Sequence, residues 1–131
     1  DMQRTAVYSN PNMAAAYDKL GQTDKAEETY LLAAANGQEK AANKALGNIY
    51  LKKALAANKA KQFSQAIDLA KKSNSFNESS KAYYIIGLAA QNSNKLDEAI
   101  AAFEKYLELE PSAANSQDVR TVVEGLKKAK K

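Results

Sequence analysis

The side chains that most often do chemistry are scarce in this sequence of 131 residues. It contains no histidine and no cysteine, so the commonest general base, the commonest metal ligand, disulfides and thiolate nucleophiles are all excluded. The glycine-rich phosphate-binding patterns GxGxxG and GxxxxGK followed by Ser or Thr are absent. The candidate chemistry is therefore limited to paired carboxylates and to a serine–lysine pair.

Two pairs of adjacent acids are the clearest candidates for acid–base work. Glu27 and Glu28 form one pair, and Asp97 and Glu98 form the other. Each pair lies in the first turn of an expected helix, where carboxylates complement the helix dipole. The abundant lysines lie on amphipathic helices, where we expect them to be solvated. We therefore expect no enzyme activity, no catalytic or cofactor-binding residues, no cofactor and no metal site.

The composition predicts long helices. Apolar residues make up 45% of the chain, and 26 alanines stand against only five glycines and two prolines. Glycines, a proline and short polar turns such as 74–77 separate the helical segments. Helices are expected over residues 12–20, 23–35, 38–61, 64–72, 79–91, 96–109 and 114–129.

The helical segments form pairs with a shared pattern. The clearest unit spans 80–113, which is 34 residues. At fixed spacing it has an aromatic residue, a large residue before glycine, an alanine four positions before an aromatic residue, and a closing proline. These are Tyr83, Ile86, Gly87, Ala90, Ala99, Phe103, Tyr106 and Pro111. The middle unit repeats parts of this pattern with Leu46, Gly47, Tyr50, Phe63, Ala66 and Ile67, and the first with Tyr17, Leu20, Gly21, Ala26, Tyr30 and Ala33.

With this pattern the chain resembles the tetratricopeptide repeat (TPR) family. The resemblance implies one all-α domain over 1–131, a right-handed helical solenoid of three helix pairs. The repeats are expected at about 8–39, 40–79 and 80–113, with a capping helix over 114–129. Gly47, Ala66, Gly87 and Ala99 are expected where helices cross closely, with Tyr30, Tyr50 and Phe103 filling the space between pairs.

The middle and first repeats depart from the family pattern. Gly47 and Ala66 are 19 residues apart, against 12 for Gly87 and Ala99. The surplus of seven residues is nearly two helical turns, and we assign it to a helix extension over 53–60 that protrudes from the solenoid. Pro11 predicts that the first helix begins late, so residues 1–9 are interpreted as a remnant of an upstream segment. The compartment in which the protein works is not indicated.

In the resembled family, the first helices of successive pairs line a groove that holds an extended peptide or a partner helix. The resemblance implies that the peptide- or partner-binding residues of this chain are Lys44, Asn48, Leu51, Lys52, Lys81, Tyr84, Leu88, Gln91 and Asn92. Lys44 and Asn48 have the spacing of a carboxylate-gripping motif known in the family. Ile85 stands where that motif requires asparagine, so the motif is incomplete.

The charge distribution is uneven. Residues 40–72 hold eight lysines and one acid, whereas residues 95–124 hold three bases and seven acids. These charges are typical of solvated helix faces, and they are also compatible with an acidic partner. Arginine is scarce, no aromatic platform for single strands is evident, and no apolar run could span a bilayer. Nucleic acid and integral membrane insertion are therefore not expected.

Three functional hypotheses follow from the sequence. The first is a non-catalytic interaction module that binds a protein or peptide in its groove. The second is a structural or assembly segment that continues a longer solenoid, stacks on an adjacent domain or self-associates into a homo-oligomer. The third is a basic surface that docks on acidic lipids or polymers.

Overall fold

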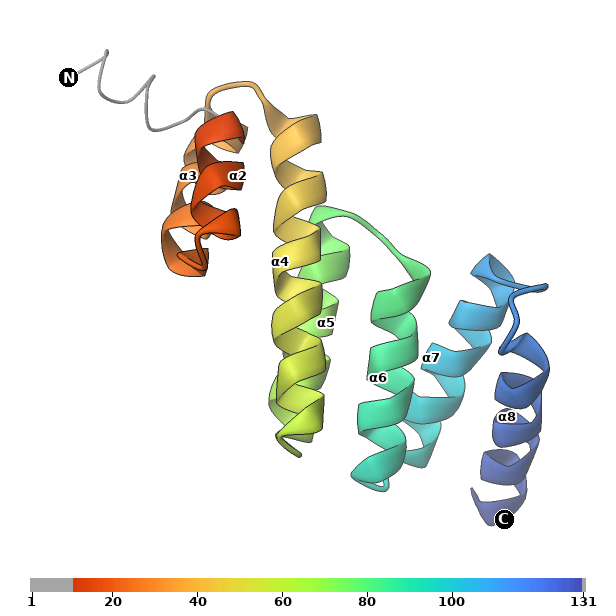
Figure 1. The fold of residues 1–131 in the computed structure, drawn as a ribbon. Helices are drawn as coiled ribbons and strands as arrows, with labels where there is room; N and C mark the ends of the chain where they lie inside the picture. Colours follow the sequence, from red (N-terminus) through yellow and green to blue (C-terminus); the bar gives the residue numbers. More distant parts are fainter. Residues whose placement is uncertain (1–10, 131) are drawn as a thin grey trace. The chain divides into compact units, whose positions relative to one another are not determined.

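The computed structural model describes residues 11–130 and contains seven α-helices and no strand in that range (Figure 1). The all-α prediction is thereby confirmed, whereas the interpretation of residues 1–9 lies outside the described residues. None of the described helices combines the length and hydropathy needed to cross a bilayer. The helices are α2 (Pro11–Lys19), α3 (Thr23–Ala35), α4 (Glu39–Lys59), α5 (Phe63–Phe76), α6 (Ser80–Asn92), α7 (Leu96–Leu109) and α8 (Ser116–Lys130).

The chain divides within α4 into two compact units, Asp1–Ile49 and Tyr50–Lys131. In the first unit, α2 packs against α3. Gly21 joins them with a φ of 78°, a left-handed conformation that favours glycine. Ala14 of α2 and Ala26 of α3 are completely buried, and Tyr30 is 7% exposed. This unit therefore begins as a pair of short helices that pack through small side chains.

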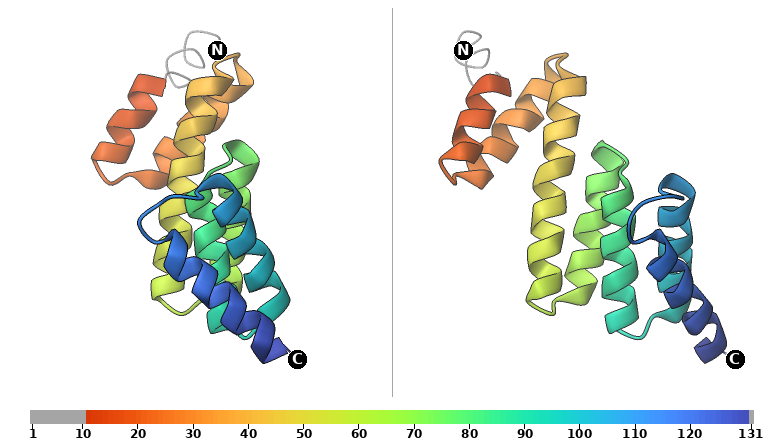
Figure 2. Two further views of the ribbon diagram at one scale, coloured as in Figure 1. Left: turned by 90° about the vertical axis from the view of Figure 1, so that its right-hand side faces the viewer. Right: turned by 45° about the vertical axis from the view of Figure 1, so that its right-hand side comes forward.

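In the second unit, α5 packs against α6, α6 against α7, and α7 against α8 (Figure 2). One core cluster runs through the unit from the C-terminal half of α4 to α8. It includes Ala54 and Ala57 of α4 and ends on Val123 and Leu126 of α8. Each helix covers the apolar face of its neighbour, and α8 covers the last pair.

The repeat pattern correctly predicts a close helix crossing in the second unit at Gly87. A Cβ atom placed on Gly87 of α6 would lie 2.6 Å from ring carbons of Phe103 in α7. Phe103 is 1% exposed and Ala99, one turn earlier on α7, is completely buried. Gly87 therefore lets the Phe103 ring lie directly against the α6 backbone.

The turns of the second unit show where the middle helix pair aligns with the last one. Lys61 and Asn94 are the two described non-glycine residues with positive φ, at 62° and 61°. They lie 33 positions apart, each between the two helices of a pair. At the same offset, Ala54 corresponds to Gly87 and Ala66 to Ala99, and all four are buried. The residue of the middle pair that takes the place of Gly87 is therefore Ala54, not Gly47.

This alignment corrects the expected position of the helix extension. α4 has 21 residues against 13 in α6, so a long helix is present. The stretch 53–60 does not protrude, because Ala54 is completely buried and Ala57 is 6% exposed in the core. The additional turns lie instead at the N-terminal end of α4, ahead of Gly47, which aligns with Ser80 at the start of α6. Gly47 itself is buried.

The structure also corrects the end of α5. The stretch 74–77 was expected to be a turn, but α5 continues to Phe76. The Phe76 ring stacks on Tyr50 with a centroid distance of 5.7 Å, and Ser73 is 1% exposed. Burial of this last turn extends the helix despite its polar sequence. The short connection from α5 to α6 is held by Asn74 in the last turn of α5, whose Oδ1 accepts a hydrogen bond from the Ser79 N–H at 2.9 Å.

Candidate functional site: a basic groove in the second unit

The nine residues expected to bind a partner divide between the two units. Lys44 and Asn48 lie in the first unit, and both are exposed on α4. Leu51 and Lys52 lie on the part of α4 that belongs to the second unit. Five lie on α6, namely Lys81, Tyr84, Leu88, Gln91 and Asn92.

Three of these residues line one pocket of about 300 Å³ in the second unit, which we call the groove pocket. The helices α4 and α6 contribute most of its wall, and α7 and the loop before α8 complete it. Its lining consists of Leu51, Leu55, Lys81, Tyr84, Ile85, Tyr106 and Asn115. The pocket thus combines aliphatic and aromatic walls with one cation and one carboxamide, which is a pattern typical of binding sites.

Aromatic contacts hold the inner wall of the groove pocket. The Tyr84 ring meets the Phe103 ring edge to face at 5.9 Å, and it lies tilted 5.3 Å from the Tyr106 ring. Aromatic pairs at these separations add stability beyond the area that they bury. Tyr84 is only partly buried. Its position is therefore fixed from behind while part of its surface remains open to a ligand.

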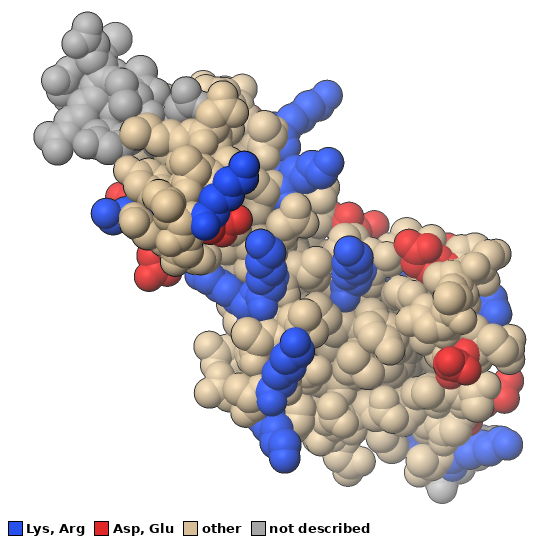
Figure 3. Space-filling model, in the orientation of Figure 1, with Lys and Arg blue, Asp and Glu red and all other residues tan. Residues whose placement is uncertain are grey.

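The two helices that form most of the groove pocket carry only positive charge within the second unit. Residues 50–59 of α4 contain Lys52, Lys53 and Lys59, α6 contains Lys81, and neither segment contains an acid. Figure 3 views this face, with lysine side chains along α4 and most of the unit's carboxylates toward α7 and α8. Lys81 is exposed and makes no ion pair with any carboxylate in residues 11–130. Its charge is therefore available to a ligand.

The loop between α7 and α8 closes one side of the groove pocket and is held by hydrogen bonds. The Tyr106 hydroxyl donates to Asn115 Oδ1 at 2.6 Å, and Ser80 Oγ donates to Glu110 Oε1 at 3.0 Å. Ser116 Oγ donates to the Glu110 carbonyl, and Arg120 donates to the Pro111 carbonyl, both at 2.6 Å. These bonds tie the loop to α6, α7 and α8.

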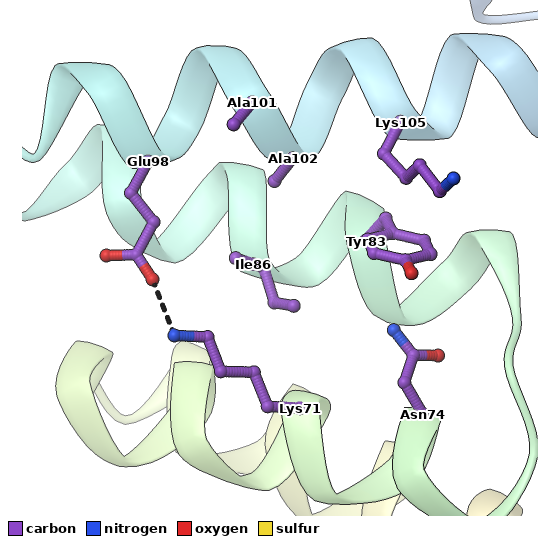
Figure 4. A pocket seen from close by; sticks show the side chains of 8 residues that line it. All are labelled: Lys71, Asn74, Tyr83, Ile86, Glu98, Ala101, Ala102 and Lys105. Atoms are coloured by element: carbon purple, nitrogen blue, oxygen red, sulfur yellow. Dashed lines mark ion pairs between the residues drawn. The ribbon is translucent and has the colours of Figure 1, made fainter.

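A second pocket, of about 510 Å³, lies between α5 and α7 over α6 (Figure 4). We call it the α5–α7 pocket. Ile86 and Tyr83 lie between the two flanking helices, and Lys71 Nζ of α5 reaches across to Glu98 Oε1 of α7 at 3.0 Å. Its lining residues are Lys71, Asn74, Tyr83, Ile86, Glu98, Ala101, Ala102 and Lys105.

The charged and hydroxyl groups of the α5–α7 pocket already have partners in the protein. Lys105 Nζ lies 3.5 Å from Glu108 Oε2, and the Tyr83 hydroxyl donates to Glu78 Oε2 at 3.0 Å. Burial and the hydrogen bond to Glu78 raise the pKa of Tyr83 above its ordinary value, so this hydroxyl remains a donor at neutral pH. Because these groups neutralise one another, this pocket has no net preference for a charged ligand.

The sequence analysis missed four residues of the groove pocket and included several that lie elsewhere. Leu55 was assigned to the protruding extension, although it aligns with the groove candidate Leu88 at the 33-residue offset. Ile85 was noted only as a departure from the family motif. Tyr106 was used only as a repeat marker, and Asn115 lies in a loop that has no periodic signal. Lys52, Gln91 and Asn92 are exposed but do not line this pocket, and Leu88 packs against the core.

The described residues contain no cluster of three or more acidic side chains that could hold a metal ion. Asp97 and Glu98, one of the two acidic pairs considered for catalysis, are in the first turn of α7. Glu98 pairs with Lys71, and Asp97 pairs with Lys130 of α8. Through these ion pairs, the two acids connect α7 to α5 and to α8.

Comparisons with known proteins agree with the repeat architecture. Two models of the tetratricopeptide repeat match the chain, one over residues 80–113 and the other over residues 5–35. No curated protein matches the sequence. Several solved structures of TPR domains resemble the fold of the chain.

The TPR domain of Arabidopsis OM64 is 26% identical, with 97% of each chain covered and a TM-score of 0.58. The second TPR domain of human RPAP3, solved with the HSP70 peptide SGPTIEEVD, is 23% identical over 95% of this chain and 97% of that chain, with a TM-score of 0.56. The first TPR of Spaghetti (RPAP3), bound to the HSP90 peptide SRMEEVD, is 24% identical over 98% of this chain and 94% of that chain, with a TM-score of 0.58.

The matched segments coincide with helix pairs that the structure shows. The match over 80–113 covers α6, α7 and the proline that follows them, and the match over 5–35 ends with α3. Gly87 and Ala99 lie at the close helix crossing that the repeat pattern requires. Sequence pattern, helix packing and fold comparison thus give one result: this chain belongs to the tetratricopeptide repeat family.

Proposed function

We propose that the protein is a non-catalytic interaction module whose second unit binds an acidic peptide in the groove pocket. The observation that carries this proposal is an open apolar pocket that contains a cation, Lys81, between two helix segments without acids. Lys81 forms no ion pair within residues 11–130. An aliphatic side chain of the peptide would contact Leu51, Leu55 and Tyr84. A neighbouring carboxylate would lie beside Lys81.

The fold comparisons support a peptide as the ligand. Two of the structurally similar TPR domains were solved with peptides that end in EEVD, which places carboxylates beside a valine. The charge of α4 and α6 in the second unit is complementary to such a peptide. Complementary charges raise the association rate and select the partner, and apolar burial supplies much of the affinity.

The synthetic peptide SGPTIEEVD is a suitable probe, with binding measured by isothermal titration calorimetry. The charge-reversal variant Lys81→Glu should weaken binding about tenfold, because it replaces an attraction in the groove by a repulsion. Lys95→Glu is the matched control: it makes the same charge change at an exposed position in the α6–α7 turn, outside the pocket. Equal affinities of these two variants, or no saturable binding by the wild type, would contradict the proposal.

The apolar part of the groove can be tested with a second matched pair. Leu55 lines the pocket and is 42% exposed, whereas Leu109 lies at the end of α7 outside it and is 41% exposed. Leu55→Ala should weaken SGPTIEEVD about threefold to tenfold because apolar contact area is lost. Leu109→Ala should leave the affinity unchanged. Binding that collapses with added salt but ignores Leu55→Ala would instead indicate a non-specific basic surface.

One observation in the first unit favours the alternative of an assembly segment. Leu31 and Leu32 of α3 are 44% and 36% exposed. Gln22 before α3 and Gln62 before α5 have closely similar backbone angles and lie 40 positions apart, so the two helices can be aligned at this offset. In this alignment Leu31 and Leu32 of α3 correspond to Lys71 and Lys72 of α5. Apolar residues thus replace lysines on an exposed helix face.

Sedimentation velocity distinguishes self-association from groove binding. If the first unit mediates assembly, the isolated wild-type chain should sediment increasingly as a dimer or larger species with rising concentration. The double variant Leu31→Lys, Leu32→Lys should then remain monomeric while its affinity for SGPTIEEVD is unchanged. A wild-type chain that stays monomeric throughout would exclude self-association and leave peptide binding as the function to test.

A further inference from the structure

Asn115 occupies an unusual position for its residue type. It directly precedes α8, and its carbonyl accepts the hydrogen bond of the Val119 N–H at 3.0 Å, so it stands at the N-cap position of the helix. An asparagine there commonly uses its side-chain oxygen to cap the first turn. In this protein the oxygen instead accepts the hydrogen bond of the Tyr106 hydroxyl at 2.6 Å.

This hydrogen bond fixes the orientation of the carboxamide. Tyr106 is 7% exposed, and its ring lies 5.3 Å from that of Tyr84, so its hydroxyl group is held in place. With Oδ1 engaged, the remaining polar atom of the Asn115 side chain is the Nδ2 donor. Nδ2 donates to no acceptor in residues 11–130, although the residue lines the groove pocket. The loop that carries Asn115 is itself tied down through Glu110 and Pro111.

We propose that Asn115 is a specificity-determining residue of the groove, which reads a carboxylate of the bound peptide together with Lys81. The inference rests on the proposed function and extends it to a polar contact from the loop before the capping helix. Lys81 supplies charge from one wall of the pocket, and the preoriented Nδ2 of Asn115 supplies a directional donor from another. A pocket with two donors and apolar walls selects an aliphatic side chain adjacent to a carboxylate over the same side chain adjacent to an amide.

The isosteric variant Asn115→Asp tests this role with little change in shape. The aspartate can still accept the Tyr106 hydrogen bond, so the loop should remain folded, but the donor is replaced by a negative charge. Binding of SGPTIEEVD should weaken by about tenfold or more, because a hydrogen bond to a charged group is lost and a repulsion is added. Ala114→Asp is the control: it adds the same charge one residue away at an exposed position outside the pocket, and should change affinity much less.

A double-mutant cycle with the peptide separates carboxylate reading from a general effect. The probe SGPTIQQVN, amidated at its C-terminus, replaces all three acidic side chains and the terminal carboxylate by amides, and Asn115→Asp should cost it little because no carboxylate faces the new charge. Repeating the cycle with SGPTIEEVD amidated at its C-terminus shows whether the carboxylate that Asn115 reads is the terminal one or a side chain. Tyr106→Phe should weaken the acidic peptide about threefold, since the carboxamide loses its orienting partner.

The outcomes distinguish failure of this inference from failure of the proposed function. If the wild type shows no saturable binding of SGPTIEEVD, the proposed function itself is wrong. If the wild type binds but Asn115→Asp binds equally well, or loses the same factor with both peptides, Asn115 does not read a carboxylate. A merely structural role would lower the melting temperature of the variant without the dependence on peptide charge.

Discussion

At the scale of single residues, the fold depends on small side chains at a close helix crossing. Phe103 is almost completely buried, and its ring lies against the backbone of α6 at Gly87. Any added Cβ atom would meet an aromatic ring that is held by Tyr84 and by the rest of the core. Glycine in a helix is otherwise unfavourable, so its presence in α6 reflects packing.

Gly87→Ala should therefore destabilise the protein by about 1–3 kcal/mol, since the cost of overpacking exceeds the roughly 1 kcal/mol by which alanine favours a helix over glycine. Gly125→Ala in α8 is the matched control, because a Cβ atom there has nothing within 4 Å. That change should raise stability. Urea unfolding of both variants measures the difference, and equal stabilisation by the two would show that Phe103 moves aside without cost.

The sequence allowed single packing positions to be predicted where close packing requires a residue type that is uncommon in this chain. It did not allow this where the packing position holds a common residue type. Gly87 stands out in an alanine-rich helix, and the crossing predicted there is confirmed. Ala54 takes the same place in the middle pair, but it is one alanine among many. The sequence analysis therefore aligned Gly47 with Gly87. Asn115 was missed because its position depends on a loop conformation fixed by hydrogen bonds, which no periodic pattern records.

At the scale of elements, helix boundaries were predictable where glycine or proline marks them. Gly21, Gly37 and Pro111 lie just beyond α2, α3 and α7 respectively. Where only polar residues suggested a helix boundary, tertiary contacts determined where the helix ends. α5 runs through a polar stretch to Phe76 because the stack on Tyr50 stabilises its last turn.

The capping helix α8 is attached to α7 through a narrow apolar stripe. Val119, Val123 and Leu126 are 4%, 6% and 8% exposed, and Lys127 and Lys130 pair with Glu104 and Asp97 of α7. Exposed ion pairs of this kind contribute little to stability. The apolar stripe therefore holds the cap in place.

Val123→Ala should lower the free energy of unfolding by about 2 kcal/mol, because it leaves a cavity between α7 and α8. Lys128→Ala, at an exposed position on the same helix, should change it by less than about 0.5 kcal/mol. Chemical denaturation followed by circular dichroism gives both values. A loss from Lys128→Ala as large as that from Val123→Ala would mean that charge, and not apolar packing, holds the cap.

At the scale of the whole molecule, charge is sorted among helices. The formal net charge of +4 conceals a basic segment over 40–72 and an acidic one over 95–124. Within the second unit the acids concentrate on α7 and the loop after it, where they pair with lysines of α5 and α8, while α4 and α6 remain free of acids. The net charge is too small to account for a preference for an acidic partner. The predicted preference therefore comes from the placement, within the second unit, of lysines on α4 and α6 and of acids on other helices.

The helices α2 and α3 bury fewer and smaller apolar side chains than the helices of the second unit. In α2 only Ala14 is buried, and α3 buries two alanines, a threonine and Tyr30, whereas the second unit has a continuous core that includes Ile86, Ile100 and Phe103. In repeat proteins, stability is approximately a sum over helix pairs and their nearest-neighbour contacts. The helices α2 and α3 should therefore open more readily than α6 and α7.

Native-state hydrogen exchange measures this difference directly, because amides report the free energy of the opening that exposes them. Amides of α2 and α3 should exchange through openings of lower free energy than those of α6 and α7. Ala16→Gly, at an exposed position in α2, should lower protection in α2 and α3 by roughly 1 kcal/mol and leave α6 and α7 unchanged. If the variant lowered protection equally in all helices, the chain would unfold as one cooperative body, and the division within α4 would have no energetic meaning.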